Sequence, residues 1–487
     1  MNEDGRLEPE VRAVAIVVIV GAIMSILDTT IVNVALESLS RDLDAPLSTI
    51  QWVATGYLLA LATVIPVTGW AAERFGPRRV WMTVVSGFVA TSALCGLAWS
   101  AESLIAFRVL QGLAGGMIMP IGMITLAQAA GPRRVGRVMS VVGVPMLLGP
   151  VLGPVIGGLI VTHLSWRWIF LVNLPIGLVG LALAARLLPS ARAQGLGTGP
   201  ARLDWRGLLL LSPGVALVVF GLSEISTHGS LSASGLGPVV GGLALVAGFV
   251  LHAWRAPAPL VDVRLFREHG FAAAGATIFL VGAALFGALL LLPLYFQIAR
   301  GQSPLEAGLL MAPQGLGAAL GMNRAGRLTD RIGGGPVVVA GLLMLMGGTV
   351  AFTQVGANTS YAVLEASLVL RGVGLGFTMM PAMAAAYSTL ERTQVPRATP
   401  MLNVVQRIGG SLGTAVLAVV LQRQLGGQVV AGAGSPAGVA AAFAHTYWWA
   451  MAITALAIVP AVVLALTQRA HARREAAAAP TPAASVG

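Results

Sequence analysis

Long apolar stretches recur along almost the whole of this 487-residue chain. About 20 apolar residues are enough for a helix to cross the roughly 30 Å hydrocarbon core of a bilayer. With 56% hydrophobic and only 10% charged residues, the chain has too little polar surface for a soluble globule. The sequence therefore predicts an all-α integral membrane protein with fourteen spans, at residues 12–36, 48–70, 79–99, 102–129, 135–162, 167–188, 206–225, 236–254, 271–298, 305–323, 336–354, 361–387, 398–422 and 444–467.

The net charge of +11 comes entirely from arginine, because the chain contains no lysine. An even number of spans places both termini on one side, and most arginines fall in the loops of that side. The opposite loops hold only Arg41, Arg167, Arg300 and Arg423. Since basic residues concentrate in cytoplasmic loops, we predict cytoplasmic N- and C-termini in a bacterial cytoplasmic membrane. The charge thus indicates topology, and no nucleic-acid partner is expected.

Enzyme chemistry has little support in the sequence. Cys95 is the only cysteine, so no intramolecular disulfide is possible. The six histidines show no metal-ligand spacing, and neither a nucleophile elbow nor a GxxxxGK[ST] phosphate loop is present. We therefore expect a protein that is not an enzyme, with no catalytic residue, metal or cofactor.

Two similar loops indicate an internal repeat. Gly69-Trp-Ala-Ala-Glu73-Arg74-Phe-Gly76 follows the second span, and Gly326-Arg-Leu-Thr-Asp330-Arg331-Ile-Gly333 follows the tenth. Two related six-helix halves with a site between them are a transporter architecture. The predicted segments are a cytoplasmic N-terminus (1–11), an N-terminal bundle (12–188), a cytoplasmic linker (189–205), two additional helices (206–254), a cytoplasmic loop (255–270), a C-terminal bundle (271–467) and a disordered cytoplasmic tail (468–487).

Asp28 is the only acid between Val11 and Leu36 in the first span. A carboxylate in hydrocarbon is costly, and such acids usually mark ion or substrate pathways. At about 1.5 Å per residue, Asp28 lies roughly 12 Å and Arg108 roughly 9 Å below the same outer end. Arg108 can therefore stabilise the ionised Asp28, and a change in this pairing as the halves move would couple protons to transport. A static buried pair is the alternative interpretation.

Several motifs in order resemble one family. They are Leu27-Asp28-Thr29-Thr30 in the first span, the loop from Gly69, Arg108-Val-Leu-Gln111-Gly112, the Gly/Pro run after Gly143, and Trp166-Arg167-Trp168 with Asn173-Leu-Pro175. These motifs are similar to those of the fourteen-span drug:proton antiporters of the major facilitator superfamily (EmrB/QacA type). The chain departs from the pattern at Glu37, where a proline is usual, and at Glu73, where an aspartate is common.

The resemblance implies a major facilitator fold of two six-helix bundles plus two extra helices, and assigns roles to three sets of residues. The proton-coupling residues would be Asp28, Arg108 and Glu365. A cytoplasmic gate would contain Gly69, Glu73, Arg74, Gly76, Arg78, Gly326, Asp330, Arg331 and Gly333. The antiporter motif, which would seal the carrier against leak, would contain Gly143, Gly149, Pro150, Gly153, Pro154, Gly157 and Gly158.

The substrate cavity should combine apolar walls with few polar anchors. Candidate lining residues are Asn33, Gln51, Trp52, Tyr57, Phe286, Tyr295, Gln297, Met379, Arg371, Gln406 and Arg407. Some exporters of lipophilic cations in this group carry an acid deep in the tenth span, where this chain has only Glu306 near the outer end. Because intramembrane arginines slightly outnumber acids, the cargo is expected to be neutral, zwitterionic or anionic.

These observations predict a proton-coupled exporter of small hydrophobic or amphiphilic compounds, including antibiotics, that works by alternating access. The partners would be the substrate, protons and membrane lipid, and the protein would be monomeric. Three alternatives remain: a solute:proton uptake symporter of the same fold, a flippase for a lipid or lipid precursor, and a sensor that does not transport.

Overall fold

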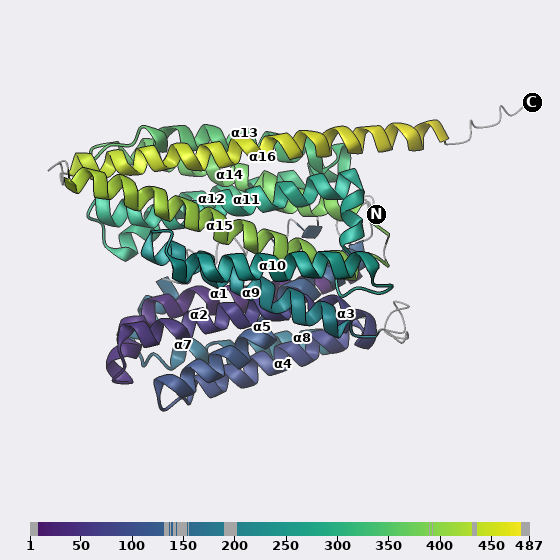
Figure 1. Ribbon diagram of the computed structural model, residues 1–487, viewed down its shortest axis with the longest axis horizontal. Helices are drawn as coiled ribbons and strands as arrows, with labels where there is room; N and C mark the ends of the chain where they lie inside the picture. Colours follow the sequence, from purple (N-terminus) through teal and green to yellow (C-terminus); the bar gives the residue numbers. More distant parts are fainter. Residues whose placement is uncertain are drawn as a thin grey trace, which may run out of the picture.

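The computed structural model describes residues 8–130, 155–188, 202–388, 390–391, 393–430 and 436–478, with the single positions 136, 138, 139, 143 and 153. Within these residues the fold is helical and contains no strand. Two helical bundles lie beside each other, one formed by the first part of the chain and one by the last (Figure 1). The chain thus has the two-part arrangement that its internal repeat predicts.

The N-terminal bundle follows the predicted spans closely. Its helices are α1 (Pro9–Asp42), α2 (Leu47–Val64), α3 (Val67–Phe75), α4 (Pro77–Gly96), α5 (Ala101–Ala130), α7 (Trp168–Leu171) and α8 (Asn173–Leu187). The predicted second span is divided into α2 and α3 at Ile65 and Pro66, because proline cannot donate a backbone hydrogen bond inside a helix. Most of the predicted span 135–162 lies outside the described residues.

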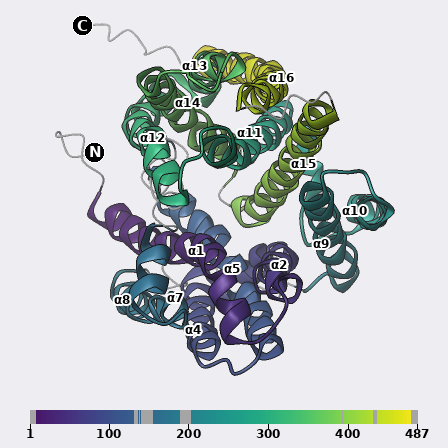
Figure 2. The same cartoon turned by 90° about the vertical axis from the view of Figure 1, so that its left-hand side faces the viewer.

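Two further helices, α9 (Trp205–His228) and α10 (Ala233–Arg255), follow the N-terminal bundle and form an antiparallel pair. Their backbones approach closely, since a Cβ atom at Gly242 would lie 2.6 Å from the carbonyl oxygen of Gly214. Helix α9 lies against both α2 and α15 (Val395–Val430), whereas α10 packs on the outer face of α9 (Figure 2).

The C-terminal bundle contains η2 (Val263–Arg267), α11 (His269–Leu294), the π-helix η3 (Tyr295–Ala299), α12 (Pro304–Ile332), α13 (Gly334–Thr353), α14 (Tyr361–Ser388), α15 and α16 (Pro436–Ala478). Glycines bring α12 and α14 into backbone contact, and a Cβ atom at Gly321 would lie 2.7 Å from the carbonyl oxygen of Val373. Ser303 and Glu306 form a capping box at the start of α12, which explains Glu306 without a transport role.

Twelve of the described helices are long and apolar enough to cross a membrane. Helix α12 is not among them. The start of α1 and the end of α16 lie at the same end of the bundles as α3 (Figure 1). Helix α16 continues to Ala478 and so enters residues 468–487, for which the sequence predicts a disordered tail. Residues 479–487, 1–7 and the linker residues 189–201 lie outside the described residues.

Candidate functional site

Asp28 lies inside the N-terminal bundle and has three side-chain partners. Arg108 Nη1 donates to Oδ2 at 2.7 Å, while Asn173 Nδ2 and Gln111 Nε2 donate to Oδ1 at 2.9 Å and 3.1 Å. Asp28 is 1% exposed, as is Arg108, so the ion pair is excluded from solvent. The predicted approach of Arg108 to Asp28 is therefore seen, and α8 adds a donor through its first residue, Asn173.

The Arg108 guanidinium has several other partners. Its Nε donates to the carbonyl oxygen of Val53 at 3.2 Å, and its Nη1 also donates to Gln111 Oε1 at 2.7 Å. The guanidinium carbon lies 3.9 Å from the centre of the Tyr57 ring. Arg108 and Gln111 share one face of α5 because they are three residues apart. These hydrogen bonds thus offset much of the free-energy cost of removing the charges of Asp28 and Arg108 from water.

The Asp28 network belongs to one half of the molecule only. Ser92 links Asn173 to the carbonyl oxygen of Phe170, and the Cys95 thiol donates to Gln111 Oε1 at 3.4 Å. Apolar side chains of α1, α2, α4, α5 and α7 form a buried cluster around the next turns of α1, including Ile31, Leu39, Val53, Leu104 and Phe170. Asp28 is consequently closed off from water in this conformation.

A cavity of about 350 Å³ lies between the two halves, within the usual size range of small-molecule sites. The lining residues come from α1, α2, α5, α11, α12, α14 and α15. They are Ser25, Ile26, Thr29, Thr30, Leu58, Leu61, Met119, Leu285, Phe286, Leu289, Met311, Gln314, Gly315, Ala318, Leu375, Met379 and Arg407. Ser25 and Thr29 flank Asp28 along α1. The face of α1 that lines the cavity is therefore next to the face that carries the Asp28 carboxylate.

Three of the predicted cavity residues line this cavity: Phe286, Met379 and Arg407. The other eight are not among its described lining residues: Asn33, Gln51, Trp52, Tyr57, Tyr295, Gln297, Arg371 and Gln406. Trp52 is 44% exposed and stacks on Phe220 of α9, with ring centres 6.0 Å apart. Tyr295 donates to the carbonyl oxygen of Gly356. These aromatic residues therefore pack between helices.

Glu365 is not part of the Asp28 network. It is exposed on α14, next to the buried Leu364. Arg371 does not pair with it, but donates from Nη1 to Thr349 Oγ1 at 2.7 Å. Gln406 lies beside Met379, with Nε2 at 3.7 Å from the sulfur. The structure thus brings Asp28 and Arg108 together and leaves the third predicted coupling residue apart.

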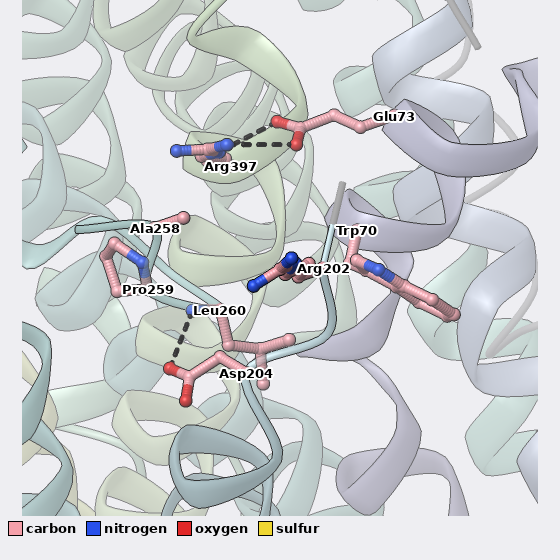
Figure 3. A pocket seen from close by; sticks show the side chains of 8 residues that line it. All are labelled: Trp70, Glu73, Arg202, Asp204, Ala258, Pro259, Leu260 and Arg397. Atoms are coloured by element: carbon pink, nitrogen blue, oxygen red, sulfur yellow. Dashed lines mark hydrogen bonds and ion pairs between the residues drawn. The ribbon is translucent and has the colours of Figure 1, made fainter. Parts of the chain in front are cut away.

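At the end of the molecule that carries α3, an ion pair joins the two halves. Glu73 of α3 accepts hydrogen bonds from Arg397 Nε at 2.8 Å and Nη2 at 3.1 Å (Figure 3). Gly69, one turn earlier, lies so close to α15 that a Cβ atom there would collide with the carbonyl oxygen of Pro396. The sequence predicted a gate at Glu73 but did not identify Arg397 as its partner.

The two repeated loops have the same backbone geometry. Gly76 (φ 82°) precedes α4 and Gly333 (φ 86°) precedes α13, and side chains rarely adopt this φ. Each glycine N–H donates at 3.0 Å to a carbonyl oxygen four residues earlier, in Ala72 or Thr329. The repeat predicted from sequence is therefore present in three dimensions.

Of the remaining gate residues, Arg78 contacts the end of a helix. Arg78 Nη2 donates to the carbonyl oxygen of Ala185 at 2.6 Å, at the end of α8. A Cβ atom at Gly136 would lie 2.8 Å from Asp330 Oδ1, which places the start of the predicted fifth span beside the second loop. Arg74, Asp330 and Arg331 are exposed, and Gly326 is buried. Both loops thus face the other half.

Asp204 anchors the additional helix pair beside this ion pair. Its carboxylate accepts hydrogen bonds from the backbone N–H of Gly207 and of Leu260 and from Nε2 of His252, at 2.9, 3.1 and 2.9 Å. Burial raises the pKa of Asp204, but these hydrogen bonds lower it more, so the net pKa is below its usual value. Asp204, Leu260, Glu73 and Arg397 border a gap of about 30 Å³, too small for a substrate (Figure 3).

The antiporter motif is described in part. Cβ atoms at Gly153 and Gly157 would collide with Thr30 and Ile31 of α1, just beyond Asp28, and one at Gly143 would collide with Met322 of α12. Gly158 has nothing within 4 Å of its Cβ position. Gly149, Pro150 and Pro154 lie outside the described residues. Gly153 and Gly157 therefore permit close contact with α1, whereas the clash at Gly143 is with the flexible end of Met322.

Sequence reasoning missed several cavity residues and two partners of Asp28. Ser25, Thr29 and Thr30 could have been found from their spacing, because they surround Asp28 within one turn of the same helix. Gln111 and Asn173 were quoted only as parts of motifs, although both are amides near a buried acid. Met311 and Gln314 had no sequence signal, since they depend on which face of α12 meets the other half.

Two helical halves around a central cavity, joined at one end by repeated loops, define a transporter. The sequence profile of the Major Facilitator Superfamily matches residues 18–414. The chain belongs to the major facilitator superfamily and is a multi-pass membrane protein.

Curated relatives of this chain are named as drug-resistance proteins. The chain is 44% identical to the "Multidrug resistance protein B homolog" of Mycobacterium tuberculosis strain H37Rv, over 86% of this chain and 78% of the relative. It is 32% identical to the "Tetracenomycin C resistance and export protein" of Streptomyces glaucescens, over 87% and 77%. It is 33% identical to the "Putative multidrug resistance protein MdtD" of Serratia proteamaculans, over 90% and 91%.

Solved structures share the fold at low sequence identity. The human organic anion transporter MFSD10 is 19% identical, with a TM-score of 0.65 over 94% of this chain and 100% of that one. The proton:xylose symporter XylE is 15% identical, with a TM-score of 0.62 over 92% and 94%.

Proposed function

We propose that this protein exports small amphiphilic compounds, antibiotics among them, from a bacterial cell in exchange for protons. The observation that carries the proposal is a buried carboxylate, Asp28, beside a cavity between the two halves of the molecule. The names of the relatives, which include two multidrug resistance proteins and one export protein, support the direction and the class of cargo.

The proposed cycle places the Glu73 side in the cytoplasm of a fourteen-span protein. Helix α12 has 29 residues, enough at about 1.5 Å per residue to cross the bilayer, and residues 135–162 would supply the remaining span. With Glu73 bound to Arg397, the cytoplasmic side is closed. When this ion pair opens, the cavity between the halves becomes accessible from the cytoplasm, as alternating access requires.

Asp28 would carry the proton in this cycle. A proton that enters from outside neutralises Asp28 and removes the attraction of Arg108, which then retains Gln111, the Val53 carbonyl and the Tyr57 ring as partners. Release of the proton to the cytoplasm restores the ion pair. Because all of these groups lie in the N-terminal half, protonation changes the packing of α1 against α5 and α8, and α1 also forms a wall of the cavity.

Everted membrane vesicles provide the test, because their outer surface is the cytoplasmic side. With an acidic lumen, the parent protein should accumulate fluorescent amphiphiles inside, and nigericin should abolish the accumulation. Asp28→Asn should reduce gradient-driven accumulation to the level of vesicles without the protein. Asp42→Asn is the matched control, since it makes the same change at an exposed end of the same helix.

Two results would contradict the proposal. Accumulation by Asp28→Asn at the parental rate would show that Asp28 does not couple protons to transport. Accumulation that requires an alkaline lumen would identify a symporter in place of an antiporter.

A further inference from the structure

The central cavity carries one formal charge among its described lining residues, the guanidinium of Arg407. Asp28 does not balance this charge, because its carboxylate is already bonded to Arg108, Gln111 and Asn173. No described residue forms a hydrogen bond or ion pair with Arg407. An arginine that faces an apolar cavity without a counterion is costly, and an anion in the cavity would recover that free energy.

The position of Arg407 is fixed by close packing of α15 on α11. A Cβ atom at Gly413 would collide with the carbonyl oxygen of Ala283, and one at Gly409 with that of Phe279. The backbone around Arg407 therefore has little room to shift. Its side chain enters a cavity whose other walls are largely aliphatic, aromatic and methionine side chains, including Phe286, Met311 and Met379.

Gln314 of α12 supplies a second, independent sign of a ligand. It is 8% exposed and lines the cavity, and its Oε1 is buried without a hydrogen-bond partner among the described residues. The nearby hydroxyl groups of Thr29 and Thr30 donate to carbonyl oxygens of their own helix, in Ser25 and Ile26. A buried acceptor without a donor costs about 1–3 kcal/mol, so a ligand with an N–H or O–H group would satisfy it.

From this geometry we propose that the cavity binds compact amphiphilic anions: an apolar or aromatic body, one carboxylate, sulfonate or ionised phenol that pairs with Arg407, and a hydrogen-bond donor that reaches Gln314. The inference deepens the proposed export function by assigning the charge class of the cargo. Organic cations of the same size are excluded from the preferred class, because no described carboxylate lines the cavity to receive them.

Equilibrium binding to protein in lipid nanodiscs tests this assignment with one fluorophore in three charge forms. Dansylglycine is the anion, its amide is the neutral analogue, and dansylcadaverine is the cation, with empty nanodiscs subtracted. The parent should bind dansylglycine about tenfold more tightly than the amide, since a charge-assisted hydrogen bond contributes at least about 1.4 kcal/mol. Dansylcadaverine should bind most weakly.

Variants then assign the preference to one residue. Arg407→Gln should raise the Kd of dansylglycine about tenfold and change that of the amide less than about twofold, and Arg407→Lys should keep part of the preference. Gln314→Leu should weaken the anion and the amide equally. Arg423→Gln, an exposed arginine on the same helix, is the matched control and should behave like the parent.

Equal affinity for the three charge forms, or an unchanged anion preference in Arg407→Gln, would overturn the inference. Binding of the neutral amide reports on folding, because a misfolded variant loses both ligands. The comparison of the three probes on the parent protein tests the charge preference without any variant. No proton gradient is used, and Asp28→Asn should keep the anion preference. Failure of coupled export with selective binding would contradict the proposed function alone.

Discussion

At the scale of single residues, the buried Arg108 and the partly buried Arg407 differ in what neutralises them. Arg108 meets a carboxylate, a side-chain amide, a backbone carbonyl and an aromatic ring. Arg407 meets none of these among the described residues. The first arginine therefore completes a stable polar core inside one half, and the second remains available to a ligand between the halves.

The Asp28–Arg108 pair allows a quantitative test. Arg108→Gln leaves a buried carboxylate without its cation and should destabilise the protein by about 3–5 kcal/mol, the usual cost of breaking a buried ion pair from one side. Asp28→Asn combined with Arg108→Gln should recover most of this loss, because neither charge remains. Thermal unfolding in detergent would measure both effects. A double variant as unstable as Arg108→Gln alone would show that the pair is not the source of the stability.

The proximity of Asp28 and Arg108 could be predicted from sequence because it needed depth alone. Asp28 and Arg108 occur at similar depths in helices of opposite direction, and the structure joins them at 2.7 Å. Depth does not indicate which way a side chain points. For this reason Glu365, placed in the membrane by the same counting, is exposed on α14, and eight of the proposed cavity residues do not line the cavity.

At the scale of helices, α3 and the start of α15 form a closure between the halves. Only the Glu73–Arg397 pair crosses this contact as a described salt bridge, and its side chains are 19% and 34% exposed. Partly exposed pairs contribute little free energy, so this ion pair adds only a small part of the stability of the closure. A weak latch suits a gate that has to open in every transport cycle.

Loss of the Glu73–Arg397 ion pair should favour the conformation in which the cavity is accessible from the Glu73 side. In everted vesicles, a cysteine placed in the cavity by Met311→Cys should react with a membrane-impermeant maleimide about two- to fivefold faster when Glu73→Gln is added, since an exposed ion pair contributes up to about 1 kcal/mol. The native Cys95 is buried and should contribute little labelling. The exchange of charges in Glu73→Arg with Arg397→Glu should return the rate toward the parent value. If removal of the ion pair left the rate unchanged, Glu73 would not hold the gate closed.

Helix positions were largely predictable because crossing a bilayer requires long apolar segments. Three details of the helices that were not predicted depend on local backbone chemistry. Pro66 divides the second span, the last turn before Arg300 is a π-helix, and α16 runs to Ala478 because its alanine-rich end is a good helix former. A hydropathy profile does not detect a helix break, a π-helix or the exact end of a helix.

At the scale of the whole molecule, the number of crossings can be decided by alkaline phosphatase fusions, which are active only outside the cytoplasm. With fourteen spans, fusions after Ala130 and Gly333 should be inactive and fusions after Ser165 and Gln302 active, because α12 and residues 135–162 would each cross the bilayer. Equal activity after Ala130 and Ser165, or after Gln302 and Gly333, would remove the corresponding span. A fusion at the C-terminus should be inactive.

The overall organisation followed from the sequence repeat, but the place of the additional helices did not. Hydropathy predicted α9 and α10 as spans and could not say which seam of the molecule they occupy, since lipid-facing and helix-facing surfaces are both apolar. In the structure, α9 covers the seam between α2 and α15 (Figure 2). Asp204 fixes its start next to the gate through Leu260 and His252.

The two sides of α9 are not equivalent. Toward α15, its Val218, Leu222 and Ile225 form a buried apolar cluster with Ala415 and Val419. Toward α2, it offers the partly exposed stack of Phe220 on Trp52. Rocking of the halves must break one of these contacts, and the looser one is on α2. The α9–α10 pair would then move together with the C-terminal half and slide over α2 in each cycle. Friction with the surrounding lipid would therefore act on this one side of the protein.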